Sequence, residues 1–202
     1  MERRFVSRKH FFYFFLSQHT HTHTYIHTQG SNQIPTPNID RLARNGVRLS
    51  NYYVNPVCSP TRASLMSGRS MMHTGIQTPY PAGNDASGLN LSYTILPEQL
   101  KERFNYTNYM IGKWHLGQKT KKYLPSSRGY DKFYGYYHGC SDYWKKYGDL
   151  QDNNEAGLDL HLGGSAMFGF TPGEDKPLYN TSDEYSTSLY AKVASKWIEE
   201  HS

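Results

Sequence analysis

Cys58 and Arg62 are the residues whose type and spacing point most directly to chemistry. Cys58 stands at the predicted start of a helix, where backbone N–H groups and the helix dipole favour a thiolate or an attached oxyanion. Arg62 follows four residues later, one helical turn away, and projects to the same side. The pair predicts an anion-binding corner that can hold a nucleophile. An ordinary buried cysteine followed by a surface arginine fits these two residues as well.

A second group of chemically capable residues lies in the segment 112–117, which reads GKWHLG. Taken alone, Lys113 and His115 at the end of a strand are more often structural than functional. The longer string around the cysteine changes that interpretation, because residues 58–69 read CSPTRASLMSGR. A chance match to Cys-x-Pro-x-Arg alone is expected in roughly one such chain in a hundred, and a Leu-x-x-Gly-Arg tail makes it about a thousandfold rarer.

These strings resemble the motifs of the type I sulfatase family. Residues 58–69 are similar to its Cys-x-Pro-x-Arg signature with the Leu-x-x-Gly-Arg tail, and residues 112–117 are similar to its Gly-Lys-Trp-His-Leu-Gly motif. Residues 36–43, TPNIDRLA, are similar to the helix that leads to the strand before the signature. The resemblance covers about residues 35–202 and is closest to the arylsulfatase B group, which desulfates glycosaminoglycans.

The resemblance implies a sulfuric ester hydrolase in which a formylglycine-generating enzyme oxidises Cys58 to formylglycine (3-oxoalanine). In that family one hydroxyl of the hydrated aldehyde, held on a divalent cation that is usually calcium, attacks sulfur while the alcohol leaves, and deprotonation of the other hydroxyl then expels sulfate and regenerates the aldehyde. Cys58 would be the nucleophile precursor and a metal ligand. Arg62 would hold the diol, Lys113 would bind the sulfate, and His115 would assist the collapse that releases it.

The chain departs from the family pattern where the metal is bound. That pattern opens with a strand ending in paired aspartates, whereas this sequence has no Asp-Asp pair and a His/Thr tract occupies that place. The later Asp-Asn pair of the pattern falls beyond residue 202. Calcium takes about six oxygen ligands or more, of which an oxidised Cys58 would supply roughly one or two. We therefore expect the 202-residue chain neither to hold calcium tightly nor to turn over substrate.

Three hypotheses remain open from the sequence. The first is an active sulfatase of which this chain is an N-terminal fragment. The second is an inert sulfatase-derived fragment that serves at most as a binding module for sulfated glycans. The third, a phosphatase or phosphodiesterase relative, is disfavoured because those relatives place Ser or Thr where this chain has Cys58. The resemblance suggests a sulfated sugar such as N-acetylgalactosamine sulfate, but fold-level analogy cannot choose the sugar.

The charge distribution argues against a nucleic-acid partner. The formal net charge is +5, but residues 1–10 carry three of those five charges. The rest of the chain therefore has no basic stripe of the kind that follows a phosphate backbone. The 18 tyrosines offer rings for burial and hydroxyls for hydrogen bonds, which suits a polar cleft.

The family resemblance implies a lysosomal or secreted protein, and three sequons favour a secretory route. Asn90, Asn105 and Asn180 begin Asn-x-Ser/Thr sequons, which are glycosylation acceptors in the secretory pathway. The segment 3–16 only partly resembles a signal peptide, because its apolar run is six residues long and no small-x-small cleavage site follows. No apolar run is long enough for a membrane span. Cys140 is left to pair with Cys58 or with a cysteine outside this sequence.

The organisation changes near residue 30. We predict that residues 1–34 are a low-complexity His/Thr tract without a fold, and that residues 35–202 are a partial sulfatase catalytic domain. The histidines of the tract could gather a transition metal, but an irregular repeat fixes no ligand geometry. A translated simple repeat is the plainer interpretation.

The segment from Pro35 onward alternates predicted helices and strands, which favours an α/β sheet. We expect a partial alkaline-phosphatase-like sulfatase domain with a central mixed sheet flanked by helices, lacking its first strand and its C-terminal part. Helices are expected at 37–45, 60–67, from Pro97 to about 104, and at 183–200, and strands at 47–54 and 108–113. Residues 117–180 are expected to be mainly loops.

Overall fold

The structure is a computed structural model that describes residues 9–15, 34–49, 51–78, 88–148, 157–166, 169–171, 173, 175–178 and 184–200. The chain forms two compact units. One comprises residues 1–15 together with 57–202, and the other comprises residues 16–56.

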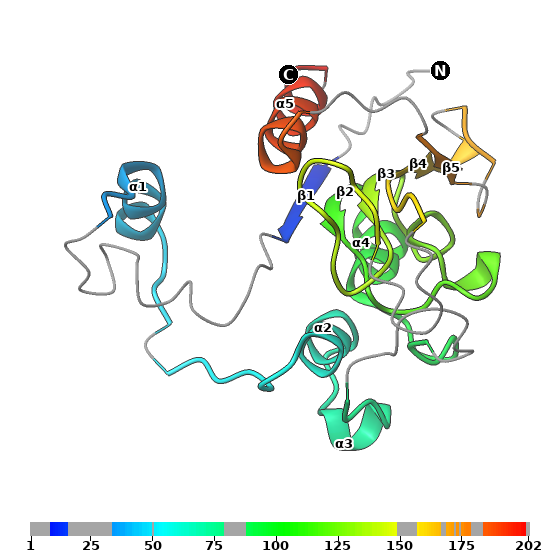
Figure 1. Ribbon diagram of the computed structural model, residues 1–202. Helices are drawn as coiled ribbons and strands as arrows, with labels where there is room; N and C mark the ends of the chain where they lie inside the picture. Colours follow the sequence, from blue (N-terminus) through cyan, green and yellow to red (C-terminus); the bar gives the residue numbers. More distant parts are fainter. Residues whose placement is uncertain are drawn as a thin grey trace, which may run out of the picture. The chain divides into compact units, whose positions relative to one another are not determined.

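The larger unit is built on one mixed sheet, whose strands lie side by side in chain order (Figure 1). The strands β1, β2 and β3 run parallel, and β4 and β5 continue the sheet antiparallel. The expected mixed α/β sheet is therefore confirmed. The bounds are β1 Lys9–Phe15, β2 Tyr106–Lys113, β3 Lys132–Tyr136, β4 His161–Gly164 and β5 Lys176–Pro177.

The expectation that the sheet lacks its first strand is wrong. β1 pairs with β2 over its whole length, from Lys9 opposite Tyr106 to Phe15 opposite Gly112. The aromatic run that imitates a signal peptide has high strand propensity, and β2 offers it a parallel partner. β1 lies inside the segment 1–34, so the expected lack of a fold does not hold for these seven residues. The His/Thr tract itself lies outside the described residues.

The helices follow the sequence expectations more closely. The smaller unit contains α1 (Pro37–Asn45). The larger unit contains α2 (Cys58–Ser67), α3 (Met71–Thr74), α4 (Leu96–Phe104), α5 (Ser186–Glu199) and two short 3₁₀ turns, η3 (Lys121–Tyr123) and η4 (Pro125–Ser127). Gly68 ends α2 in the left-handed conformation, as predicted. No helix of the described ranges is long and apolar enough to cross a membrane.

Two expectations for local structure are wrong. Ser59 does not cap α2, because the helix begins at Cys58 and Val57 takes the capping position. The expected strand at 47–54 does not form in the described residues 47–49 and 51–54. A strand needs a partner for the hydrogen bonds of its backbone groups. The described part of the smaller unit contains no strand that could pair with residues 47–54.

The side chains of β2 alternate between two apolar cores, one on each face of the sheet, as expected of a strand buried on both sides. Met110 enters the first core with residues of α2, and Tyr109 and Ile111 enter the second with residues of α5. The first core is Ala63, Met66, Ile76, Leu89, Ile95, Met110, Trp114, Leu116, Leu124, Tyr130, Phe133 and Tyr137. The second is Tyr109, Ile111, Tyr134, Leu160, Ala194 and Trp197.

Two glycines face each other where β2 and β3 end. Gly112 pairs in register with Gly135, and Gly112 has a φ of 99°, a region that glycine tolerates best. A Cβ at Gly135 would lie 2.0 Å from the carbonyl oxygen of Gly112, well inside contact distance. The close approach fixes the backbone one residue before Lys113.

We predict that Gly135→Ala lowers the free energy of unfolding by about 2 kcal/mol or more, because β2 and β3 must move apart. Denaturant unfolding of the purified chain measures this. Gly157→Ala is the control, since a Cβ there meets open space. Equal stability of the two variants would contradict the close approach.

Candidate active site

Cys58 is the first residue of α2 and is partly buried. The first N–H groups of a helix have no intrahelical acceptor, so they and the helix dipole favour an anion at this position. The side chain of Cys58 also interacts electrostatically with Lys113, which lies far away in the sequence. The predicted anion-binding corner therefore contains a second cation besides Arg62.

Lys113 is the last residue of β2 and is 6% exposed. Its ammonium donates to the carbonyl oxygen of Gly139 at 2.6 Å and interacts electrostatically with the side chain of Cys58. Burial lowers the pKa of Lys113 below its ordinary value, while Cys58 acts in the opposite direction. Lys113 thus links the start of α2 to the chain that follows β3.

Arg62 lies one turn after Cys58 and is 1% exposed. Its Nε donates to the carbonyl oxygen of Trp114 at 2.8 Å, and its Nη2 donates to the carbonyl oxygen of Lys113. A buried guanidinium is tolerated when its donors meet acceptors, and two of its three nitrogen atoms donate to backbone carbonyls here. These bonds attach α2 to the end of β2.

His115 follows two residues after Lys113 and is also buried. Its backbone is in the left-handed region, with a φ of 55°, and its N–H donates to Tyr137 O at 3.0 Å. Its Nδ1 lies 3.4 Å from the hydroxyl oxygen of Ser59. A Cβ at Gly139 would lie 3.0 Å from its Cε1, so this glycine leaves room for the imidazole ring.

The structure therefore brings together the residues that the sequence singled out, and we call Cys58, Arg62, Lys113 and His115 the Cys58 cluster. Sequence reasoning missed Gly139, which accepts from Lys113 and borders His115. Both cysteines are free thiols, so the pairing of Cys140 with Cys58 does not form in this structure.

The Cys58 cluster does not fit calcium with the residues that the structure describes. Within those ranges no three His, Cys, Asp or Glu side chains gather as a metal site. The groups around Cys58 are the donors Lys113 and Arg62 rather than carboxylates. Calcium takes about six oxygen ligands or more, and these cationic donors do not supply them.

The predicted glycosylation sites remain predictions. Asn90 and Asn105 are exposed, and Asn105 adopts the left-handed conformation at the end of α4. Asn180 lies outside the described residues.

Comparison with known proteins identifies the class of this site. The Sulfatase family model matches residues 16–202. Mouse (Mus musculus) arylsulfatase J is 34% identical over 170 residues, covering 84% of this chain and 26% of that protein. Mouse N-acetylgalactosamine-6-sulfatase is 38% identical over 108 residues, covering 50% of this chain and 20% of that protein.

Solved structures agree with the sequence relatives. Ps i-CgsB superposes with a TM-score of 0.72 at 28% identity, covering 88% of this chain and 39% of that chain, and a second structure of it is a complex with k-i-k-neocarrahexaose. The PsFucS1 sulfatase from Pseudoalteromonas sp. superposes with a TM-score of 0.60 at 26% identity, covering 86% of this chain and 37% of that chain.

The chain belongs to the sulfatase family, as the resemblance of its motifs predicted. It spans about a quarter of the length of arylsulfatase J.

We predict that Arg62→Met lowers the free energy of unfolding by about 2–4 kcal/mol, because it leaves the carbonyl oxygens of Lys113 and Trp114 without these donors in a buried place. Thermal or denaturant unfolding measures the loss. Arg103→Met is the matched control, since Arg103 is exposed on α4. A loss below about 0.5 kcal/mol at Arg62 would contradict its anchoring role.

Proposed function

We propose that the protein is a sulfuric ester hydrolase of the arylsulfatase type, acting through a formylglycine made from Cys58. The observation that supports this most is the Cys58 cluster itself. Lys113 and His115 lie more than 50 residues from Cys58 in the sequence, yet Lys113 interacts electrostatically with its side chain and His115 contacts the adjacent Ser59. The cluster places two cations and an imidazole around the first residue of a helix.

Each residue of the cluster has a role that its geometry supports. Formylglycine at position 58 would supply a hydrated aldehyde as the nucleophile. Lys113 and the N-terminus of α2 would offset the negative charge on the sulfuryl oxygens. His115 would accept the proton whose removal precedes the release of sulfate. Arg62 would hold the diol, as the family resemblance implies, while two of its donors fix the backbone at Lys113 and Trp114.

We propose a sulfated carbohydrate as the substrate, with glycosaminoglycan sugars such as N-acetylgalactosamine sulfate as the first choice. The support is the similarity to N-acetylgalactosamine-6-sulfatase, together with the oligosaccharide complex of Ps i-CgsB. A formylglycine-generating enzyme would be the partner that modifies Cys58. The corresponding location is the secretory pathway or the lysosome, with Asn90, Asn105 and Asn180 as glycan acceptors.

For the 202-residue chain alone we propose that calcium is not held tightly and that substrate is not turned over. The cluster offers donors where a hard cation needs oxygen ligands. The alternative, an inert fragment that binds sulfated glycans, is favoured by the same observation. Two buried cations could attract a sulfate group without completing the reaction.

The nucleophile assignment predicts that Cys58→Ala and Cys58→Ser each lower kcat by about 10³-fold or more in the longest protein that the gene encodes. Hydrolysis of an aryl sulfate measures this, and an aldehyde-reactive probe on the peptide containing residue 58 detects the oxidation. Cys140→Ser is the matched control, with activity retained. Turnover that survives Cys58→Ala would contradict the assignment. Salt-sensitive retention on heparin without any hydrolysis would favour the binding module.

The proposal that the 202-residue chain does not hold calcium tightly predicts that calorimetry of this chain detects no calcium binding in the micromolar range. The physical reason is the shortage of oxygen ligands around Cys58. Magnesium serves as the control titrant for nonspecific charge effects. A micromolar dissociation constant for calcium would show that this chain assembles a metal site by itself.

A further inference from the structure

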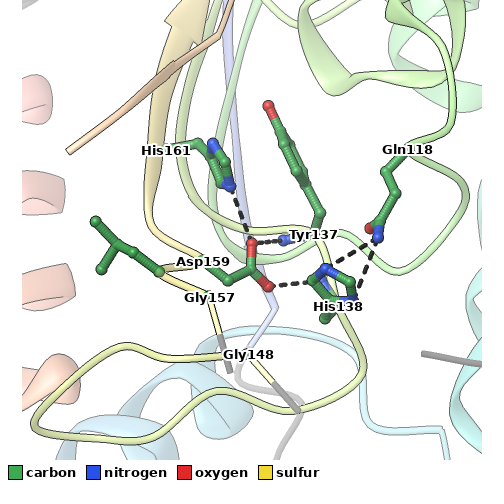
Figure 2. Close-up of a pocket in the computed structure, with 8 residues that line it drawn as sticks. Gln118, Tyr137, His138, Gly148, Gly157, Asp159 and His161 are labelled. Carbon is green, nitrogen blue, oxygen red and sulfur yellow. Dashed lines mark hydrogen bonds and ion pairs between the residues drawn. The ribbon is translucent and has the colours of Figure 1, made fainter. Parts of the chain in front are cut away.

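A pocket of about 210 Å³, whose lining residues Figure 2 shows, follows the ends of the parallel strands β2 and β3. Lys113 and Tyr136 are the last residues of those strands, and His161 begins the antiparallel β4 opposite Gly135. Ligands of open α/β sheets bind at the carboxyl ends of the strands. The pocket and the Cys58 cluster therefore share the edge at which this fold binds its ligands.

Two chain connections tie the pocket to the Cys58 cluster. Gln118 lines the pocket three residues after His115. His138 lines it directly before Gly139, which accepts the hydrogen bond of Lys113 and borders the imidazole of His115. The pocket lining is therefore continuous along the chain with the residues proposed to bind and release sulfate.

One wall of the pocket is held rigid by Asp159, which is 3% exposed. Its Oδ1 accepts from the backbone N–H of Tyr137 at 2.9 Å and from His161 Nε2 at 3.0 Å, and its Oδ2 accepts from the backbone N–H of His138 at 2.9 Å. The ring of His161 stacks on Tyr137 with centroids 4.0 Å apart. Because the carboxylate of Asp159 accepts three hydrogen bonds, it orders this wall of the pocket and fixes the backbone position of His138.

Gln118 and His138 form the opposite side and are only partly buried. The amide nitrogen of Gln118 lies 3.2 Å from Nδ1 and 3.0 Å from Nε2 of His138. A carboxamide and a neutral imidazole each offer both a donor and an acceptor. Among the described residues that line the pocket there is no lysine or arginine to hold a second anionic group. Groups that both donate and accept, such as hydroxyls, complement this lining.

We propose that this pocket binds the hydroxylated ring of the sugar that carries the scissile sulfate, with Gln118 and His138 as specificity-determining residues that contact its hydroxyl groups. The inference rests on the proposed sulfatase function and adds which part of the substrate this pocket recognises. The volume is below the about 300–1,000 Å³ of sites for drug-sized ligands, which suits a single ring.

The test compares kcat/KM for a sulfated N-acetylgalactosamine with kcat/KM for a small aryl sulfate lacking sugar hydroxyls, in the longest protein that the gene encodes. Gln118→Ala and His138→Ala should each lower the sugar-to-aryl ratio by about 10-fold, the worth of one lost hydrogen bond. Lys119→Ala, an exposed neighbour of Gln118, is the control and should keep the ratio.

The outcomes separate this inference from the proposed function. Aryl sulfate turnover by the unsubstituted protein with an unchanged ratio in both variants would overturn the inference alone. Absence of any sulfate release by the unsubstituted protein would overturn the proposed function and the inference with it. Gln118→Ala decides the test if His138→Ala fails to fold, because Gln118 is partly exposed and bonds only the His138 ring among the contacts described.

Discussion

The attachment of helix α2 to the end of β2 by Arg62 is the interaction on which the site depends. Cys58 belongs to the helix, whereas Lys113 and His115 belong to the strand end and the turn after it. Only a link between these two elements can keep a helix N-terminus and a buried ammonium together. Arg62 provides a link through two backbone carbonyl groups, at Lys113 and Trp114.

The sheet supplies the second constraint, because its parallel strands bring distant segments to one edge. The chain after β2 and the chain after β3 stay paired beyond the strands, since Trp114 and His115 donate to Tyr136 and Tyr137. The two segments therefore continue side by side into the site. The apolar cores on both faces hold this edge in place without contributing to its chemistry.

The sequence predicts the local elements that carry strong signals, and it misses those that depend on distant partners. The helix at Cys58 and the buried strand before Lys113 have clear start, stop and burial patterns. β3 lies in a segment rich in tyrosine and glycine, where strand formation depends on pairing with β2. The sequence of β1 shows no alternation of polar and apolar residues. From the sequence alone it cannot be distinguished from the apolar run of a signal peptide.

The same limit applies to the site. The residues of the Cys58 cluster stand in recognisable motifs, so their identities are accessible from the sequence. Asp159 and His161 stand in no motif, and only the antiparallel register of β3 and β4 brings them near Tyr137. Side-chain contacts between segments joined by a long connection have no local signature.

Gly139 has a consequence for how this site can vary. Its carbonyl oxygen holds the ammonium of Lys113, and its missing Cβ makes room for His115. Gly139 therefore restricts the positions of both the Lys113 ammonium and the His115 ring. Among descendants of this sequence, a side chain at position 139 would meet the ring at 115 but would leave the backbone carbonyl for Lys113, so positions 139 and 115 should vary together while 113 stays as it is.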